Sequence, residues 1–303
     1  ATTITALGVE AGVASEVHMQ TRTSNGIAVP VDSRHLAPLT DSTALLGDAG
    51  ALRGRYQEDG YLYLRGVLDA GALQRLRADY FSRFDPTYLA AGTSPVDGVF
   101  SGRRPPELPE HGRAGHPAHA MVRTAEWERF VSTPSLASLA EALLGGRVRR
   151  LPRTILRHFD RSEPRASRAH IDFTYLDRGG DELVTIWIPI GDCPVECGGL
   201  IYLEGSHRIE PAELDRLRVV TDRPRDRRPI SHDLRWVSDQ LGRRWLWADY
   251  RAGDVAIHSP HLVHASLDTT ADRMRLSADV RFRRSDQAAD PRWLQPWAGD
   301  DGY

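Results

Sequence analysis

Residues 170–190 read His-Ile-Asp-Phe-Thr-Tyr-Leu-Asp-Arg-Gly-Gly-Asp-Glu-Leu-Val-Thr-Ile-Trp-Ile-Pro-Ile. The second part of this stretch, residues 183–190, is a short apolar run, and Gly179-Gly180 ahead of it indicate a turn. A run of this length after a turn is typical of a buried β-strand. The first part carries a His-x-Asp pair, His170 and Asp172. A polar pair that precedes a buried strand across a turn predicts a chemical site beside that strand.

The chain after Arg147 has the texture of short strands separated by glycine turns. The predicted strands are residues 151–159, 183–190, 200–203, 255–258 and 274–283. A further short strand is predicted at residues 60–65, ahead of the helices. Helices followed by a run of strands predict a mainly β fold, an all-β barrel or jelly roll with flanking α-helices.

Two of these helices have clear ends in the sequence. One begins after Asp69, a good N-cap residue, and carries Leu73 and Leu76 on one face. The other begins at Thr133-Pro134 and ends at Gly145-Gly146, because proline favours the first helical turn and glycine the end.

The domain organisation is predicted from changes in composition. Residues 1–40 show no sustained periodicity and are interpreted as an N-terminal arm or irregular edge segment, and residues 41–303 as a single domain. Residues 214–244, rich in Arg and Asp, are interpreted as a mostly solvated insertion between strands. Residues 102–119 are interpreted as a long loop. Its histidines are expected to be solvated: His111, His116 and His119.

Composition narrows the class of protein. The 303 residues are 41% hydrophobic and 26% charged with a formal net charge of -2, which is typical of a globular protein and gives no bulk-charge signal for nucleic acid or a membrane surface. The apolar runs are far shorter than the roughly 20 residues of a membrane-spanning helix. The N-terminus lacks the pattern of a secretory signal. Cys193 and Cys197 are interpreted as free thiols, so a cytoplasmic location is expected.

Two His-x-Asp pairs compete for a metal-binding role. His158-Phe-Asp160 lies at the end of an apolar run and is followed by a polar loop, whereas His170-Ile-Asp172 is followed by the turn and the strong strand. We therefore favour His170 and Asp172 and interpret His158 as a hydrogen-bonded strand histidine. Two histidines and one carboxylate on one face of a metal are typical of non-haem Fe(II) enzymes that activate O2.

The third ligand has three candidates in one cluster, His258, His261 and His264. A 2-oxoglutarate cosubstrate needs a fixed cation for its far carboxylate, and the planar fork of arginine suits that role. Only His264 is followed by an arginine eleven residues later, Arg275. This spacing favours His264 as the ligand and Arg275 as the cosubstrate anchor.

The strand that begins at Arg275 alternates between two kinds of residue. Ser277, Asp279 and Arg281 share the face of Arg275. The opposite face is apolar and is expected to pack against the helices: Leu276, Ala278, Val280 and Phe282. A polar face inside a barrel implies a ligand or water there.

The chain resembles the phytanoyl-CoA dioxygenase family of double-stranded β-helix oxygenases over about residues 45–282. The segments that carry the resemblance are Asp59-Gly-Tyr-Leu-Tyr-Leu-Arg-Gly-Val-Leu68, His170-Ile-Asp172, Trp187-Ile-Pro-Ile-Gly-Asp192, Gly198-Gly-Leu-Ile-Tyr-Leu-Glu-Gly-Ser-His207 and Gly253-Asp254 with His264-Ala-Ser266 and Arg275. The family includes bacterial hydroxylases that tailor secondary metabolites, and its fold is a cupin-like jelly roll.

This resemblance implies a full set of site residues. It implies iron ligands at His170, Asp172 and His264, cosubstrate contacts at Trp187, Ser266 and Arg275, and a weaker contact at Thr154. The implied reaction uses Fe(II), 2-oxoglutarate and O2 to oxidise a C–H bond, by hydroxylation or by oxidative ring closure or desaturation, with release of succinate and CO2. The intact Asp172 disfavours halogenation, since halogenases of this fold usually lack that carboxylate.

The implied substrate is a small molecule, a glycosidic or terpenoid natural product. The sequence makes no prediction about the oligomeric state. Two other functions stay open: a cupin-like metal-dependent isomerase or hydrolase without redox chemistry, which has no use for Arg275, and a jelly-roll binding module, which needs neither metal nor arginine.

Overall fold

The computed structural model describes residues 21–176, 182–218 and 229–299. Part of the predicted N-terminal arm, the predicted turn at Gly179-Gly180 and residues 219–228 of the predicted insertion lie outside the described residues.

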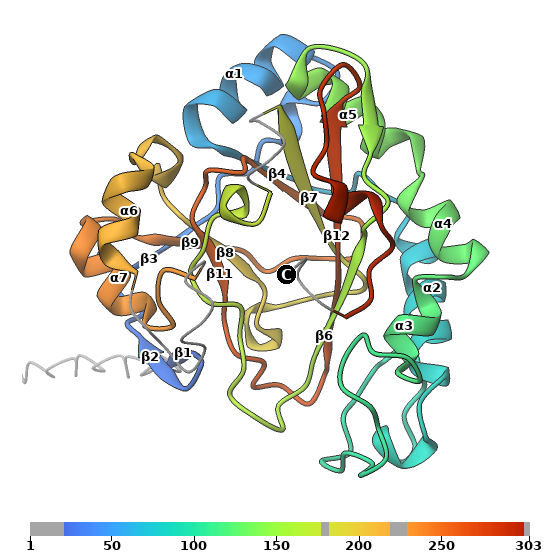
Figure 1. The fold of residues 1–303 in the computed structure, drawn as a ribbon. Coiled ribbons are helices and arrows are strands. Elements are labelled where there is room, and N and C mark those ends of the chain that lie inside the picture. Colours follow the sequence, from blue (N-terminus) through green and yellow to red (C-terminus); the bar gives the residue numbers. More distant parts are fainter. Residues whose placement is uncertain (1–20, 177–181, 219–228, 300–303) are drawn as a thin grey trace, which may run out of the picture.

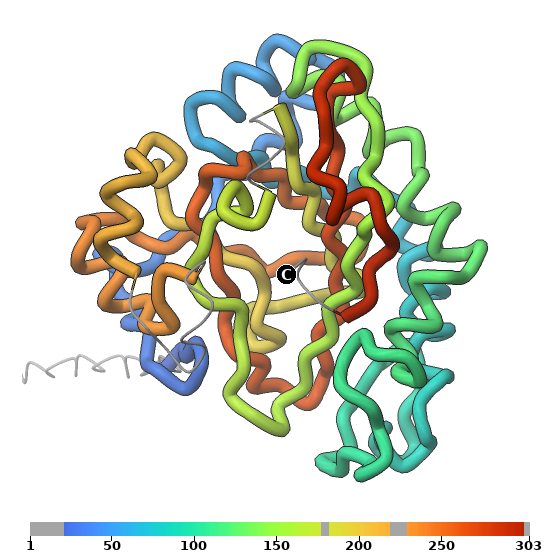
Figure 2. The backbone as a smooth tube through the Cα atoms, viewed as in Figure 1, coloured from blue at the N-terminus to red at the C-terminus, as the bar shows by residue number. Residues whose placement is uncertain are grey.

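Two β-sheets form the centre of the molecule (Figures 1 and 2). The larger sheet has the order β4-β10-β7-β12-β5, with β6 also paired to β12, and all its pairs are antiparallel. Its strands are β4 (Tyr61–Leu64), β5 (Val148–Arg150), β6 (Ile155–Phe159), β7 (Leu183–Pro189), β10 (Val255–His258) and β12 (Arg275–Arg284). The prediction of a mainly β protein with flanking helices is confirmed.

The smaller sheet has the order β11-β8-β9-β3. Its strands are β3 (Leu36–Pro38), β8 (Leu200–Leu203), β9 (Trp245–Trp247) and β11 (His264–Ser266), and a separate hairpin joins β1 (Arg22–Ser24) to β2 (Ile27–Val29). A backbone bridge between His170 and His264, with a hydrogen bond from the Ser266 amide to the Ser167 carbonyl, ties the chain ahead of β7 to this sheet. In Figure 1 the two sheets lie on either side of the middle of the molecule.

Helices cover the outer face of the larger sheet. They are α1 (Ala49–Asp59), α2 (Ala70–Ser82), α3 (Pro117–Met121), α4 (Ala125–Val131) and α5 (Pro134–Leu144). Asp69 caps α2 by accepting a hydrogen bond from the Ala72 amide, and α5 ends at Gly145 in the left-handed conformation with a φ of 70°. Both predicted helices are therefore confirmed.

The two faces of strand β12 lie in different surroundings, as the alternation of its residues predicts. One face packs against the helices, and the other faces the space between the two sheets. Leu276, Ala278, Val280 and Phe282 pack in one apolar core with residues of α1 to α5. The side chains of the other face are buried as well, although they are polar: Arg275, Ser277, Asp279 and Arg281. A strand with one face packed against helices must present its other face to whatever lies between the sheets.

The described part of the predicted insertion is not mostly solvated, so that interpretation was wrong. The helix α6 (Pro211–Leu217) overlaps its start and α7 (Leu234–Leu241) lies within it. Leu214, Leu234 and Val237 are buried in an apolar cluster with residues of the smaller sheet. The charged residues of these helices obscured the signal, because an amphipathic helix keeps its arginines and aspartates on the outer face.

The loop at residues 102–119 also differs from the prediction, because two of its three histidines are not solvated. His116 is buried and precedes α3, and the His111 and His116 rings lie 5.0 Å apart. Burial lowers the pKa of His111 to about 4 and that of His116 to about 3, so both rings are neutral at pH 7.

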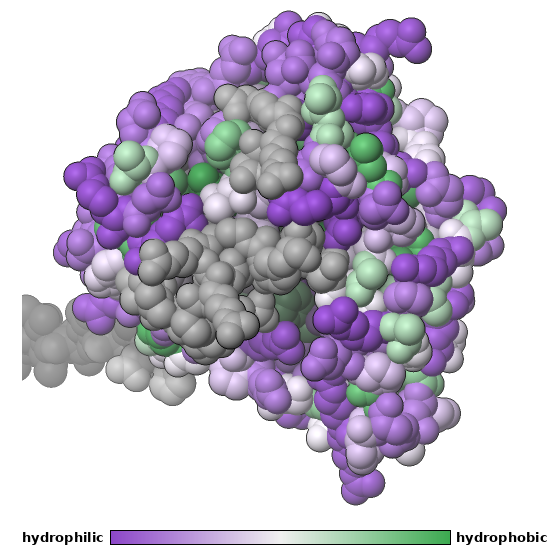
Figure 3. All heavy atoms as spheres, viewed as in Figure 1, coloured by the Kyte–Doolittle hydropathy of each residue, from purple (hydrophilic) through white to green (hydrophobic). Residues whose placement is uncertain are grey.

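Short 3-10 helices connect several elements. They are η1 (Thr43–Leu45), η2 (Pro86–Tyr88), η3 (Asp172–Thr174), η4 (Val195–Cys197), η5 (Ser206–Arg208) and η6 (Pro291–Leu294). Figure 3 shows that hydrophobic residues on the face in view are scattered among hydrophilic ones. Among the described residues, no helix is both long enough and apolar enough to span a membrane.

Candidate metal centre

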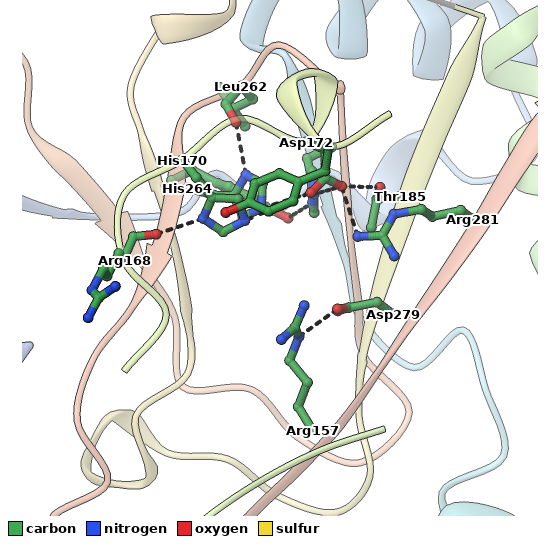
Figure 4. A network of polar contacts seen from close by, with 12 residues as sticks. Arg157, Arg168, His170, Asp172, Thr185, Leu262, His264, Asp279 and Arg281 are labelled. Atoms are coloured by element: carbon green, nitrogen blue, oxygen red, sulfur yellow. Dashed lines mark hydrogen bonds and ion pairs between the residues drawn. The ribbon is translucent and has the colours of Figure 1, made fainter. Parts of the chain in front are cut away.

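Three predicted metal ligands meet between the two sheets (Figure 4). His170 and His264 face each other across the backbone bridge, with hydrogen bonds of 3.0 and 2.9 Å between their main chains. Asp172 begins η3, two residues after His170. One nitrogen from each histidine and one carboxylate oxygen all lie within 4.8 Å of one another.

Backbone carbonyls set the orientation of both rings. The Nδ1 atoms of His170 and His264 lie 2.6 and 2.9 Å from the carbonyl oxygens of Arg168 and Leu262. A carbonyl oxygen can only accept, so each Nδ1 donates its proton and each Nε2 is the unprotonated nitrogen of its ring. Burial, with the neighbouring histidines, holds the pKa of His264 well below its usual range, so this ring is neutral.

Asp172 is held by one of its oxygens. Oδ2 accepts hydrogen bonds from Thr185 Oγ1 at 2.6 Å and from Arg281 Nη2 at 3.1 Å, and His258 Nε2 lies 3.5 Å away. Oδ1 lies 3.9 Å from His170 Nε2 and 3.6 Å from His264 Nε2. The carboxylate therefore presents Oδ1 to the Nε2 atoms of the two histidines.

The charge on Asp172 is favoured although the group is buried. Burial by itself raises the pKa of the carboxyl, but Arg281 and the His258 and His264 rings outweigh it and hold that pKa well below its usual range. An ionised carboxylate and neutral imidazoles are the protonation states that a metal needs. This donor set fits a divalent iron with open positions for other ligands.

The rival His-x-Asp pair lies elsewhere. The His158 ring packs among aromatic rings, with Nδ1 2.9 Å from the Tyr80 hydroxyl, and Asp160 accepts a hydrogen bond from Tyr88 at 2.6 Å. Burial holds the pKa of His158 well below its usual range. His158 is a hydrogen-bonded strand histidine, as the sequence predicts.

The other two candidates for the distal ligand have different neighbours. His258 lies behind Asp172, with its Nδ1 2.9 Å from the hydroxyl of Tyr202. The His261 ring packs against Phe173, with 4.5 Å between ring centroids. Neither joins the cluster of three donors formed by the described residues.

Arg275 lies in the same pocket as the three donors. This inner pocket encloses about 20 Å³ and is lined by Arg157, Ser167, His170, Asp172, Thr185, Trp187, Leu200, His258, His264, Ser266, Arg275, Asp279 and Arg281. The Arg275 guanidinium lies 3.8 Å from the centroid of the Phe159 ring, and its Nη1 donates to the carbonyl of Gly198. Burial lowers the pKa of Arg275 to about 10, so it remains charged at neutral pH.

Of the three remaining residues predicted to contact the cosubstrate, two line the inner pocket and one does not. Trp187 and Ser266 line the inner pocket with Arg275. Ser266 Oγ accepts a hydrogen bond from the Ser167 amide at 2.9 Å, and the Trp187 ring packs against Tyr250. Thr154 instead accepts a hydrogen bond from the Trp127 indole at 2.8 Å and is not among the residues that line this pocket.

Several functional candidates were missed from the sequence. Thr185 and Arg281 hold Asp172, and only Arg281 had a signal, its position on the polar face of β12. Trp293 lines the space outside the triad although it lies beyond the region of family resemblance. No local pattern marks Thr185, which sits within an otherwise apolar strand.

Two chambers lie outside the inner pocket. The first encloses about 420 Å³ and reaches His170 and Asp172; we call it the outer chamber. Its other lining residues are Asn25, Ile155, Arg157, Phe159, Glu163, Pro164, Arg165, Ala166, Ser167, Arg168, Tyr175, Pro229, Arg281 and Trp293. The second encloses about 460 Å³ and shares Ile155, Arg157, Phe159, Glu163 and Arg165 with the first.

Comparison with known proteins gives one matching family model, phytanoyl-CoA dioxygenase, over residues 56–277. A 1-deoxypentalenic acid 11-beta-hydroxylase from Streptomyces exfoliatus is 26% identical over 285 residues, which span 86% of this chain and 90% of that enzyme.

Two solved structures from nogalamycin biosynthesis are similar in fold. The non-heme alpha ketoglutarate dependent carbocyclase SnoK has a TM-score of 0.57 at 23% identity, covering 84% of this chain and 90% of its own. The epimerase SnoN, in complex with Fe3+, alpha ketoglutarate and nogalamycin RO, has a TM-score of 0.54 at 23% identity, covering 80% of this chain and 86% of its own.

Proposed function

Because the chain belongs to the phytanoyl-CoA dioxygenase family, we propose that this Fe(II)- and 2-oxoglutarate-dependent oxygenase uses His170, Asp172 and His264 as its iron ligands. The observation that carries the proposal is the cluster of three donor atoms within 4.8 Å, in one pocket with the buried Arg275. Iron and 2-oxoglutarate, when bound, supply the oxidation of a substrate C–H bond by O2, with release of succinate and CO2.

The residues of the chain orient and shield the reacting groups. His170 and His264 offer Nε2 because carbonyls hold Nδ1, and Asp172 offers Oδ1 because Thr185 and Arg281 hold Oδ2. Partners of this kind fix the direction of each ligand before the metal arrives. The surrounding residues are mostly buried, which limits the access of water to the site.

For the cosubstrate, we assign the far carboxylate to Arg275, with Ser266 and Trp187 as neighbours in the inner pocket. The pocket volume of about 20 Å³ leaves room for one water molecule, so a five-carbon diacid must displace side chains that line it. The hydrogen bond from Arg275 to the Gly198 carbonyl is the one that the cosubstrate carboxylate would replace. Thr154 is not assigned a role, since its hydroxyl is used by Trp127.

The sheet arrangement proposed for the chain is the double-stranded β-helix. Two facing sheets with the donor triad between them, in which every strand pair but β3–β9 is antiparallel, and the fold similarity to two non-heme alpha ketoglutarate dependent enzymes support it. In such a fold the ligands come from strands and loops at one end of the barrel, which suits the positions of His170 and His264.

The proposed substrate is a small-molecule natural product, glycosidic or terpenoid, that enters through the outer chamber, and the proposed reaction is hydroxylation. The relative from Streptomyces exfoliatus, a hydroxylase, supports the reaction. The chamber walls carry Arg165 and Arg168, whose cationic groups suit an acidic or oxygen-bearing substituent, beside Phe159 and Trp293, whose ring faces suit an apolar body.

The cell compartment proposed is the cytoplasm. Cys193 and Cys197 are both buried free thiols, and burial raises the pKa of Cys193 to about 12 and that of Cys197 to about 11. Unpaired cysteines suit a reducing compartment.

An anaerobic titration tests the proposed function. Adding Fe(II) and 2-oxoglutarate to the wild-type protein is expected to produce a visible charge-transfer band, which His170→Ala and Asp172→Ala should abolish. His158→Gln, which changes the rival His-x-Asp pair, should keep the band. A folded, metal-loaded wild type without a band would refute the function, and a band that depends on His158 rather than His170 would refute the ligand assignment.

A further inference from the structure

The segment after β12 returns to the metal centre. Residues 290–297, here called the C-terminal strap, include η6 and lie beyond residue 277, where the match to the family model ends. In Figures 1 and 2 the dark red chain after β12 runs back beside that strand. Trp293 in the strap is 2% exposed and lines the outer chamber together with His170 and Asp172.

Trp293 contacts the arginine that holds Asp172. The guanidinium carbon of Arg281 lies 4.5 Å from the centroid of the Trp293 ring, and Arg281 Nη2 lies 3.1 Å from Asp172 Oδ2. Arg281 Nε and Nη1 are buried and have no hydrogen-bond partner among the described residues. The guanidinium is therefore positioned by a carboxylate at one edge and an indole on one face, and little else fixes its plane.

The strap also reaches the other side of the triad. Trp293 Nε1 donates to the carbonyl oxygen of Tyr175 at 3.2 Å, and Arg292 Nη2 donates to the same oxygen at 3.0 Å. The Tyr175 ring packs edge-on against the His170 ring, with 5.4 Å between centroids and an angle of 78°. One tryptophan thus touches the supports of two of the three metal ligands.

The strap is itself held by the segment that joins β5 to β6. The Arg153 amide donates to the Trp293 carbonyl at 3.4 Å, and Arg153 Nε donates to the Arg292 carbonyl at 3.0 Å. Asp290 caps η6 by accepting from the Arg292 amide at 3.0 Å. These bonds hold the strap backbone at the position where the Trp293 ring contacts the Arg281 guanidinium.

We propose that the C-terminal strap completes the metal centre, with Trp293 as a positioning residue that keeps Arg281 on Asp172. This inference rests on the proposed function, because it assumes that Asp172 is an iron ligand. Without the indole face, Arg281 can turn toward the outer chamber and solvent. Asp172 then loses one of the bonds that direct its Oδ1 toward the histidines, and the preformed donor set is weakened.

Co(II), whose visible absorption reports its coordination, is the probe for the test, and its dissociation constant is measured without cosubstrate. Trp293→Leu is expected to weaken Co(II) binding about tenfold, the lower end of the effect of removing an outer partner of a ligand. Trp293→Phe, which keeps a ring face, should retain most of the affinity. Trp297→Leu removes a similarly buried ring from the same strap, one that packs against the His111 ring at 5.4 Å between centroids, and should leave the affinity unchanged.

A double-mutant cycle tests whether Trp293 acts through Arg281 or by a general effect on the stability of the fold. Arg281→Met should weaken Co(II) binding at least as much as Trp293→Leu, and adding Trp293→Leu to Arg281→Met should then have no further effect. Unchanged affinity in Trp293→Leu, or equal losses in the presence and absence of Arg281, would overturn the proposal. Should Trp293→Leu fail to fold by circular dichroism, unchanged affinity in Arg281→Met would overturn it as well.

The same measurements distinguish this proposal from the proposed function. A wild-type protein that binds neither Co(II) nor Fe(II) with 2-oxoglutarate shows that the function is wrong. A wild type that binds both, with a Trp293→Leu variant of equal affinity, shows that only the role of the strap is wrong.

Discussion

Replacing Thr185 by valine tests how the protein prepares Asp172 for a metal. The Thr185 hydroxyl donates to Asp172 Oδ2 at 2.6 Å, and Thr185 and Asp172 are 1% and 3% exposed. Valine keeps the shape of threonine and removes only the hydroxyl. A hydrogen bond to a charged group contributes about 1.5–3 kcal/mol. Arg281 still holds the same oxygen, so the loss in metal affinity should fall near the lower end of the usual range, about tenfold or about 1.4 kcal/mol.

The assay is an anaerobic titration of Thr185→Val with Co(II), followed by visible absorption. Thr133→Val serves as the matched control, because the Thr133 hydroxyl donates to the Phe130 carbonyl at 2.7 Å, at the start of α5 and outside the pocket. The control should bind Co(II) like the wild type. A dissociation constant for folded Thr185→Val within twofold of the wild-type value would show that the outer oxygen of Asp172 needs no such support, and would refute the reasoning.

Three further predictions follow from the structure. Arg275→Ala should weaken 2-oxoglutarate binding at least about 30-fold, because truncating one partner of a buried charge pair costs about 2–5 kcal/mol. The Co(II) affinity of this variant should stay near the wild-type value. Equal losses for both ligands in calorimetry would contradict the anchor assignment. Gly198→Ala should lower the free energy of unfolding, measured in urea, by more than about 2 kcal/mol. Gly198 has a φ of 75°, and an added Cβ would approach the Leu267 carbonyl closely. An unchanged urea midpoint would refute this prediction. Burial lowers the pKa of His111 to about 4, so below pH 6.5 the unfolded chain takes up a proton that the folded chain does not. The free energy of unfolding should therefore fall by about 3 kcal/mol between pH 6.5 and pH 4. His111→Gln should show a smaller fall, and identical pH profiles for the two proteins would exclude His111 as the cause.

The fold class could be predicted because it depends on local patterns. The apolar run at residues 183–190 and the alternation after Arg275 are visible in a few consecutive residues, and both became strands of the larger sheet. The N-cap at Asp69 and the glycine at Gly145 likewise marked helix ends correctly. The burial of residues 214–244 was underestimated because charged residues outnumber the apolar ones that pack in the core. The burial of the histidines in residues 102–119 was underestimated because a loop composition gives no sign of contacts between rings.

The three donors of the candidate site could also be predicted, through spacing rather than periodicity. His170 and Asp172 are adjacent to a strong strand, and the eleven-residue step to Arg275 selected His264 from three histidines. The structure brings all four residues to one pocket. Their roles as ligands and cosubstrate anchor stay predictions until metal and 2-oxoglutarate binding are measured.

The sequence by itself determined that this chain builds a mainly β frame and carries a His-x-Asp pair, a distal histidine and an arginine in a usable order. Only the tertiary structure decided what supports them. The bond from Arg281 to Asp172 spans 109 residues, and the bond from Trp293 to Tyr175 spans 118. Contacts between residues so far apart follow from how the sheets and the strap pack, and no local pattern encodes them. The direction of each donor is therefore a property of the folded molecule.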